Sequence, residues 1–214
     1  MYVILNSAMS IDGKITTRKN DSSISSKIDW IRVHKLRSAV DCIVIGISTV
    51  LKDDPMLNVR YAKTVKNPAR IIIDSKARIP LDSRIMRSSK KIPTFVVVTR
   101  HASLQRIKEI EKKGANVLVI GGKKVNIINL FQHLEKLGFK KVLVEGGGEI
   151  NWSVLKLGLV NELIVTIAPI VVGGRDAKTL VEGEGISYIH DAIKMNLVKS
   201  SIQDKKEIVL VYRL

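Results

Sequence analysis

Short runs of apolar and β-branched residues recur along this chain, and most of them end in a glycine or a small polar residue. The runs that predict strands cover residues 2–5, 41–46, 70–73, 94–98, 115–120 and 142–144. Segments with apolar residues at helical spacing lie between several of these runs, as in residues 104–110. Strands without polar alternation are typical of a parallel sheet buried on both faces. The alternation therefore predicts an α/β fold with a mainly parallel central sheet and flanking helices.

The last third of the chain breaks this rhythm. Residues 163–170 are apolar and β-branched, and residues 195–202 and 207–214 flank a polar stretch that can form a hairpin turn. We expect all three segments to add antiparallel C-terminal strands. Because no repeat, low-complexity tract or linker interrupts the chain, we predict a single domain over residues 1–214.

Small polar residues mark the expected helix starts. Ser25 or Ser26 can cap a helix that begins near residue 26, and Ser103 can cap another. After Gly46, Ser48 or Thr49 can cap a short helix, which ends before Pro55 because proline cannot continue it.

The charge balance raises the question of a nucleic-acid partner. The chain has 36 basic and 20 acidic side chains, a net charge of +16. The basic residues are spread along the chain and only 4% of residues are aromatic, so a base-stacking surface is poorly supported. A basic protein that handles phosphorylated small molecules has the same balance, and we expect no nucleic acid as a partner.

Cysteine content and hydropathy indicate the cellular environment in which the chain works. The single Cys42 lies in an apolar run, which predicts a buried thiol and leaves no disulfide framework and no cysteine-rich zinc site, and we expect no metal ligands. No apolar run approaches the roughly 20 residues needed to span a bilayer. We therefore expect a cytoplasmic protein without a membrane partner.

Residues 142–152 combine a strand, an acid, three glycines and a segment that can start a helix. Glycines let backbone N–H groups approach a ligand, and the dipole of the following helix favours negative charge. Glu145 would lie at the carboxyl end of its strand, where open α/β sheets bind their ligands. The stretch predicts an anion site. An ordinary tight turn with a solvated Glu145 is the alternative.

Four motifs in this order resemble the reductase family of riboflavin biosynthesis. They cover residues 10–14 (SIDGK), 33–37 (VHKLR), 46–55 (GISTVLKDDP) and 145–148 (EGGG). The likeness extends over essentially the whole chain. The zinc-deaminase signature of the bifunctional bacterial proteins is missing, so the chain is similar to the stand-alone archaeal or fungal form.

This resemblance implies a dihydrofolate-reductase-like fold, NADPH as the cofactor and a homodimer. The implied reaction reduces the ribosylamino side chain of a phosphorylated diaminopyrimidinone to ribitylamino, by hydride transfer to ribose C1′. NADH as a second cofactor and the deaminated pyrimidine as a second substrate stay open, and so does the general acid. The dimer interface is also open, although the apolar segments 163–170 and 207–214 could pair at an edge.

The resemblance also implies site residues. Glu145 is the catalytic candidate, because it could accept from sugar hydroxyls or ring amines and assist proton transfer. The implied cofactor positions are Ala8, Thr49, Asp53, Ser75, Thr99, Arg100, Gly147, Gly148, Glu149 and Ile150. The implied substrate positions are Asn6, Arg37, Leu57, Arg60 and Glu145.

Several of these residues have an alternative explanation. Arg100 could pair with the 2′-phosphate of NADPH or be a solvated loop arginine. Asp53 could hold a cofactor ribose or, with Asp54, form a turn. Asn6 stands where the bacterial relatives have a lysine, so a role that depends on that charge does not carry over. Asp12 and Lys14 are expected to be structural, and His34 to be a packed histidine.

Two other functions compete with this one. The first is a reductase of another pteridine or pyrimidine, such as dihydrofolate. The second is a basic nucleic-acid-binding protein, which would bind with strong salt dependence and would not oxidise NADPH.

Overall fold

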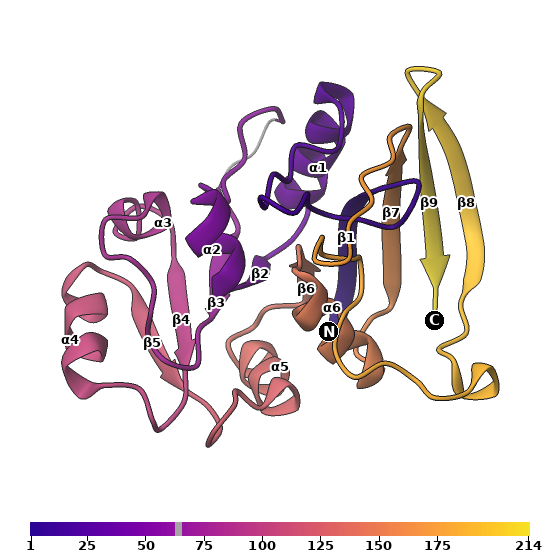
Figure 1. The fold of residues 1–214 in the computed structure, drawn as a ribbon. Coiled ribbons are helices and arrows are strands. Elements are labelled where there is room, and N and C mark those ends of the chain that lie inside the picture. Colours follow the sequence, from indigo (N-terminus) through magenta and orange to yellow (C-terminus); the bar gives the residue numbers. More distant parts are fainter. Residues whose placement is uncertain (63–65) are drawn as a thin grey trace. The chain divides into compact units, whose positions relative to one another are not determined.

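A computed structural model describes residues 1–62 and 66–214, which form two compact units (Figure 1). Unit 1 comprises Met1 and residues 35–143, and unit 2 comprises residues 2–34 and 144–214. The single domain over residues 1–214 stays a prediction. The helices are α1 Lys27–Ser38, α2 Ile47–Asp53, α3 Arg84–Arg87, α4 Leu104–Lys112, α5 Ile127–Lys136 and α6 Gly148–Lys156. The strands are β1 Tyr2–Ser10, β2 Cys42–Gly46, β3 Ala69–Ile73, β4 Thr94–Val98, β5 Asn116–Val119, β6 Lys141–Val144, β7 Glu162–Ala168, β8 Asn196–Gln203 and β9 Glu207–Arg213.

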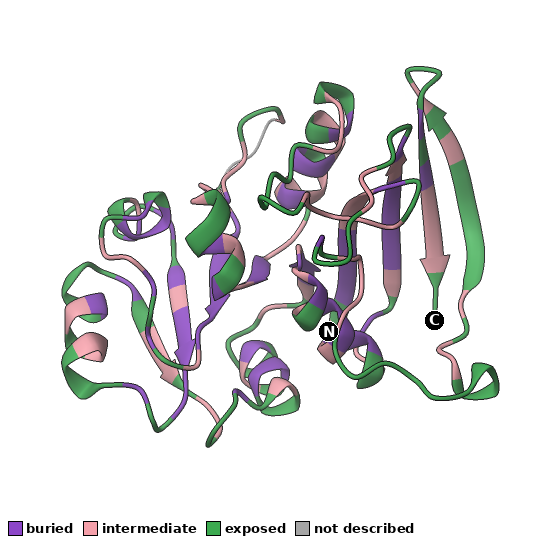
Figure 2. Ribbon diagram, in the orientation of Figure 1, coloured by how far each residue is buried: buried purple, intermediate pink, exposed green. Residues whose placement is uncertain are grey.

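Unit 1 contains a sheet in the order β5-β4-β3-β2-β6. Strands β2, β3, β4 and β5 pair in parallel, in the register Ile43↔Arg70 and Arg70↔Thr94. The central residues of β2, β3 and β4, such as Ile71 and Val96, have no exposed surface, and Figure 2 shows these three strands as mostly buried, whereas the residues of β5 are intermediate or exposed. Burial on both faces explains why the strands are continuous apolar runs rather than alternating ones. The predicted α/β fold with a mainly parallel sheet is confirmed.

Unit 2 contains strands in the order β1-β7-β9-β8. β8 and β9 form the predicted antiparallel hairpin, with residues 204–206 between them. β7 was expected to be antiparallel, which is wrong in part, because it pairs with β1 in parallel and only with β9 antiparallel. Pairing with β7 runs as far as Ser10, so the strand predicted for residues 2–5 is longer than expected.

Two of the predicted helix caps are confirmed and one is wrong. The Ser26 and Ser103 hydroxyls accept hydrogen bonds from backbone N–H groups at the starts of α1 and α4. The start of α2 differs, because Gly46 is the extended N-cap residue and supplies no side chain. Ser48 and Thr49 therefore lie inside the first turn of α2, beyond the capping position.

Two residues that the sequence marked as structural are buried as expected. Cys42 and His34 have no exposed surface. Burial raises the pKa of the Cys42 thiol to about 12, so it stays protonated and unreactive. The His34 ring lies 6.1 Å from the Trp30 ring, which agrees with a packed histidine on α1.

Candidate active site

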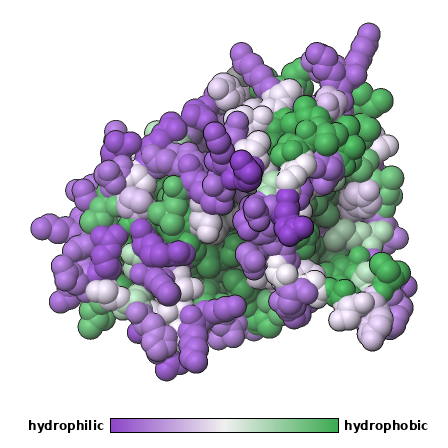
Figure 3. All heavy atoms as spheres, viewed as in Figure 1, coloured by the Kyte–Doolittle hydropathy of each residue, from purple (hydrophilic) through white to green (hydrophobic). Residues whose placement is uncertain are grey.

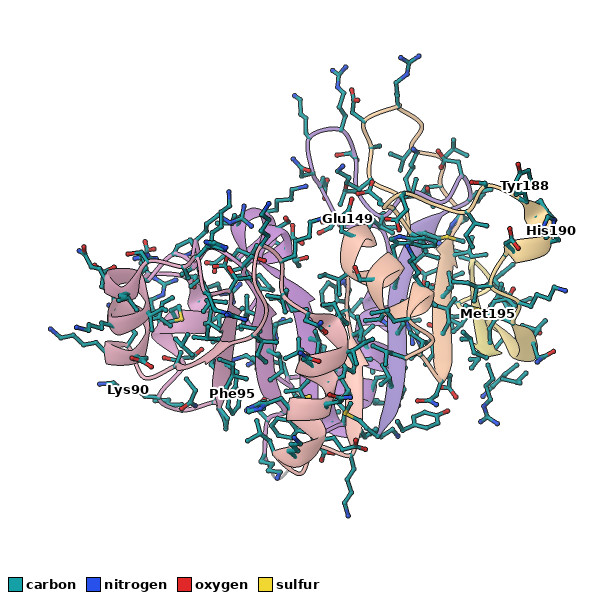
Figure 4. The ribbon with its side chains drawn as sticks, turned by 90° about the horizontal axis from the view of Figure 1, so that it is seen from below. Lys90, Phe95, Glu149, Tyr188, His190 and Met195 are labelled. Carbon is teal, nitrogen blue, oxygen red and sulfur yellow. The ribbon has the colours of Figure 1, made fainter. Side chains whose placement is uncertain are left out.

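The glycine stretch forms a turn between β6 and α6, as the sequence predicted. Gly146 has a φ of +85°, which favours glycine. Gly147 is the N-cap of α6 and provides no side-chain cap, and its carbonyl accepts from the N–H groups of Ile150 and Asn151. Glu149 lies in the first turn of the helix (Figure 4). A helix N-terminus without a side-chain cap keeps N–H groups available for an anion.

Gly147 and Gly148, the second and third glycines of this turn, differ in the space that surrounds them. A Cβ on Gly148 would lie 2.5 Å from Glu182 Cγ and 2.8 Å from the Thr179 carbonyl oxygen. The Glu182 N–H also donates to the Gly148 carbonyl at 3.2 Å, so the chain around Thr179 packs directly on Gly148. A Cβ on Gly147 would meet nothing within 4 Å. Gly147 is therefore the glycine that a ligand can approach, while Gly148 is needed for packing.

This difference predicts opposite outcomes for two alanine variants. G148A should lower the melting temperature, because the new methyl group meets backbone that cannot move aside freely; overpacking of this kind costs about 1–3 kcal/mol. G147A should keep the melting temperature and weaken binding of the NADPH that the sequence resemblance implies, because the methyl group would occupy space that is open to a ligand. Thermal unfolding and cofactor titration of both variants measure the two effects. Equal melting temperatures would contradict the packing role of Gly148.

Three other candidates in unit 2 lie on β1 or directly after β6. Glu145 follows β6 and is half-buried. Asn6 is 6% exposed, and its Oδ1 atom has no hydrogen-bond partner within residues 1–62 and 66–214. Ala8, expected after the first strand, lies within the longer β1, half-buried and paired with Thr166 of β7. An unpaired buried amide oxygen is costly, which makes Asn6 a good candidate for contact with a ligand.

In unit 1, Ser75, Thr99 and Arg100 gather at the carboxyl ends of the adjacent parallel strands β3 and β4. The Thr99 hydroxyl donates to the Ser75 carbonyl at 2.9 Å, and the Thr99 N–H donates to the same oxygen. Thr99 is buried and Ser75 is half-buried, whereas Arg100 is exposed. The structure thus brings these three candidates together at the sheet edge where α/β folds bind ligands.

The remaining candidates of unit 1 lie in α1, in α2 and in the segment after α2. Thr49 is half-buried in the first turn of α2, and Asp53 is exposed at its end. The Arg37 side chain is buried and its Nη1 donates to the Asn58 carbonyl at 3.4 Å. Leu57 is buried as well, with 2% of its surface exposed. Arg60 is exposed, and its guanidinium lies 5.8 Å from the centre of the Tyr61 ring.

Asp12 has the structural role that the sequence suggested. Its carboxylate accepts from the Ser10 hydroxyl at 2.6 Å and from the N–H groups of Val172 and Gly173. These hydrogen bonds lower the pKa of Asp12 to about 2. A lowered pKa stabilises the fold above the ordinary value of 3.8, and this contribution is lost as the pH falls towards 2. Lys14 is also structural, since its Nζ donates to the Ala177 carbonyl.

Sequence reasoning missed Arg70, which has no exposed surface although it lies within an apolar strand. A basic residue at the start of such a strand gives no signal of its own.

Within residues 1–62 and 66–214, no group of three His, Cys, Asp or Glu side chains could hold a metal ion. In the same residues, no helix is long and apolar enough to cross a membrane.

The parallel strands, the glycine turn and the antiparallel C-terminal hairpin define a dihydrofolate-reductase-like α/β fold. Dihydrofolate reductase from Enterococcus faecalis has a similar fold, with a TM-score of 0.57 at 11% identity over 99% of this chain and 95% of that one. The family described as the RibD C-terminal domain matches residues 1–210, and the chain belongs to this family. The predicted family and fold class are confirmed.

Curated relatives agree with this assignment. The chain is 44% identical over 201 residues to the 2,5-diamino-6-ribosylamino-4(3H)-pyrimidinone 5′-phosphate reductase of Methanothermobacter thermautotrophicus, covering 93% of this chain and 92% of the relative. It is 37% identical over 210 residues to the protein of the same name from Aquifex aeolicus, covering 96% and 93%. The chain spans about half of the RibD structure from Acinetobacter baumannii, covering 57% of it with a TM-score of 0.85 at 27% identity over 99% of this chain.

Proposed function

We propose that this protein reduces 2,5-diamino-6-ribosylamino-4(3H)-pyrimidinone 5′-phosphate in riboflavin biosynthesis. The observation that carries this function is the similarity to reductases of that name, at 37–44% identity over most of the chain. The predicted reductase function is confirmed at the level of a pyrimidine 5′-phosphate reductase of this pathway. The fold alone would not favour this substrate over dihydrofolate, since both classes share it.

In the proposed reaction the N-glycoside of the substrate opens to a Schiff base between ribose C1′ and the amine nitrogen. NADPH supplies the hydride that adds to C1′, and a proton reaches the nitrogen, which gives the ribitylamino product. Glu145 is proposed to hold the sugar hydroxyls and to assist proton transfer during ring opening. The other residues proposed to contact the substrate are Asn6, Arg37, Leu57 and Arg60. Either Arg37 or Arg60 is proposed to bind the 5′-phosphate.

The turn before α6 supports the proposal of a dinucleotide cofactor. In unit 2, the open side of Gly147 and the first turn of α6 suit a pyrophosphate, so Gly147, Gly148, Glu149 and Ile150 are proposed to bind it. Gly148 acts there through its backbone, because its Cβ space is filled. The other proposed cofactor residues are Ala8 near the nicotinamide, Thr49 and Asp53, and Ser75, Thr99 and Arg100 towards the adenosine end.

Arg100 tests the choice between NADPH and NADH. We expect R100A to raise the Kd of NADPH at least about tenfold and to change that of NADH little, because a charge-assisted bond to the 2′-phosphate contributes about 1.5–3 kcal/mol. Fluorescence titration with both cofactors measures the difference. His101→Ala, next in the exposed turn, is the matched control. An equal loss for both cofactors in R100A would argue against the contact with the 2′-phosphate.

We also propose a homodimer that forms through the β8–β9 hairpin. The sequence suggested pairing through residues 163–170 and 207–214, but β7 and β9 each have a strand on both sides in the order β1-β7-β9-β8, which leaves β8 as the outer strand. Leu197, Ile202 and Ile208 of the hairpin are 55%, 72% and 42% exposed. Apolar patches also stand out on the otherwise hydrophilic surface in Figure 3. A monomer in analytical ultracentrifugation at micromolar concentration would contradict this proposal.

The decisive experiment determines which atom of the substrate receives the hydride. The purified protein is incubated with the phosphorylated ribosylamino pyrimidine and NADPH deuterated at C4, using each diastereomer in turn. Mass spectrometry should find one deuterium at C1′ of a ribitylamino product with one diastereomer and none with the other. Dihydrofolate serves as the competing substrate, and turnover of dihydrofolate at a matching rate would overturn the assignment.

A further inference from the structure

The segment that follows α2 is held in an unusual backbone conformation. Asp54 and Leu57 have φ angles of +37° and +45°, in the left-handed region that disfavours residues with a Cβ. Such strain persists only where the surroundings determine the conformation, and it is common at functional sites. Residues 54–58 are therefore fixed by contacts outside the segment rather than by their own preferences.

Three residues from other parts of unit 1 anchor this segment, two through their side chains and one through its backbone N–H. Arg84 of α3 donates its backbone N–H to Asp54 Oδ1 at 2.8 Å. Arg70 Nη1 donates to the Met56 carbonyl at 3.2 Å, and Arg37 Nη1 donates to the Asn58 carbonyl. The two guanidinium groups thus hold the carbonyls on both sides of Leu57, while the Leu57 side chain is buried.

Arg70 is the centre of this arrangement. Its guanidinium also donates to the Ser88 hydroxyl at 2.8 Å, to the Ile85 carbonyl at 3.0 Å and to the Thr94 hydroxyl at 2.7 Å. Burial lowers the pKa of Arg70 to about 10, so the group stays charged at neutral pH. A planar fork with five donors can join several acceptors in fixed directions, which a lysine cannot do.

We propose that Arg70 is a positioning residue for the phosphorylated substrate. Its guanidinium fixes the Met56 carbonyl and thereby holds Leu57 in the left-handed conformation, which sets the direction of the chain towards the exposed Arg60. This inference rests on the proposed function, in which Leu57 and Arg60 serve the substrate. Arg70 itself acts only through the segment, because it has no exposed surface.

The test compares R70K with T94V. R70K keeps the charge but loses the fork, and we expect the KM for the pyrimidine substrate to rise at least about tenfold, with kcat and the Kd of NADPH changed less than about twofold. T94V removes two of the guanidinium contacts on the side away from Met56. It should lower the melting temperature while the substrate KM stays near the wild-type value. An unchanged KM in R70K, or an equal rise in T94V, would overturn the proposal.

A second variant and a second readout keep the proposal testable if R70K does not fold. D54G removes the acceptor for Arg84 but allows the left-handed backbone, and it should raise the substrate KM about threefold or more. Without ligands, backbone hydrogen exchange in residues 56–60 should be faster in R70K than in the wild type, and exchange in β4 should be unchanged. If R70K does not fold, the same comparison is made with D54G. Unchanged exchange in residues 56–60 would count against the anchoring. Failure of the wild type to reduce the pyrimidine would contradict the proposed function, and the exchange measurement would still decide whether the segment is anchored.

Discussion

Replacing Glu145 with glutamine is expected to slow turnover by about 10²–10⁴-fold, the range for one general acid or base. Glutamine keeps the size of the side chain and loses both the charge and the ability to carry a proton. Glu145 directly follows β6, so it lies at the carboxyl end of a strand, beside the turn that leads into α6. Because the cofactor is proposed to meet the backbone of that turn, the Kd of NADPH should change little.

Turnover should fall in this variant without disappearing. Holding two reactants in register can contribute about 7–11 kcal/mol, whereas a factor of 10²–10⁴ corresponds to about 3–5 kcal/mol. Orientation of substrate and cofactor therefore leaves measurable activity in E145Q. Single-turnover kinetics with the ribosylamino substrate measure the chemical step, and E111Q, an exposed acid on α4, is the matched control. Turnover of E145Q equal to that of E111Q would remove Glu145 from the mechanism.

The sequence predicted the strands and most helices because their signals are local. Buried strands such as β2 and β3 are continuous apolar runs, and Ser103 marks the start of α4 by a cap. The length of β1 was not predictable from local pattern, because residues 6–10 pair with β7, more than 150 residues away. The same holds for Gly148. A glycine is needed at this position because the chain around Thr179, distant in sequence, packs against it.

The candidate site was predictable in part. The positions at the ends of β3, β4 and β6 follow from the rule that ligands bind at the carboxyl ends of parallel strands. The burial of Arg37 and Leu57, in contrast, depends on tertiary packing, which the local sequence does not reveal, and their contact with the substrate stays a prediction. Arg70 escaped notice for the same reason, since its acceptors come from segments separated in sequence.

A buried ion pair in unit 2 gives the second large effect. Asp29 of α1 is 1% exposed, and its Oδ1 accepts from Arg32 Nε and from the Thr166 hydroxyl, both at 2.7 Å. Arg32 Nη2 donates to the same Thr166 hydroxyl at 3.0 Å. This triad attaches α1 to β7 at the residue that pairs with Ala8 of β1.

We expect D29A to lower the free energy of unfolding by about 3–5 kcal/mol, because removal of one partner leaves a largely buried guanidinium without its carboxylate. For a chain of this size the melting temperature should fall by about 6–20 °C. Thermal and urea unfolding measure both quantities. Replacing all three groups by apolar ones, in D29L/R32M/T166V, should recover much of the loss, since no buried charge then remains unpaired.

The chain provides a matched control with the same spacing and the same distance. Arg106 Nη1 and Glu109 Oε2 on α4 are also three residues apart and 2.7 Å apart, but their side chains are 31% and 35% exposed. E109A should therefore cost only about 0–1 kcal/mol, as exposed pairs do. The contrast tests the effect of burial, because the two pairs share spacing and distance and differ strongly in their access to water, although Arg106 also donates to the carbonyls of Ala77 and Ile79. Equal losses in D29A and E109A would show that desolvation of the guanidinium does not decide the stability of this triad.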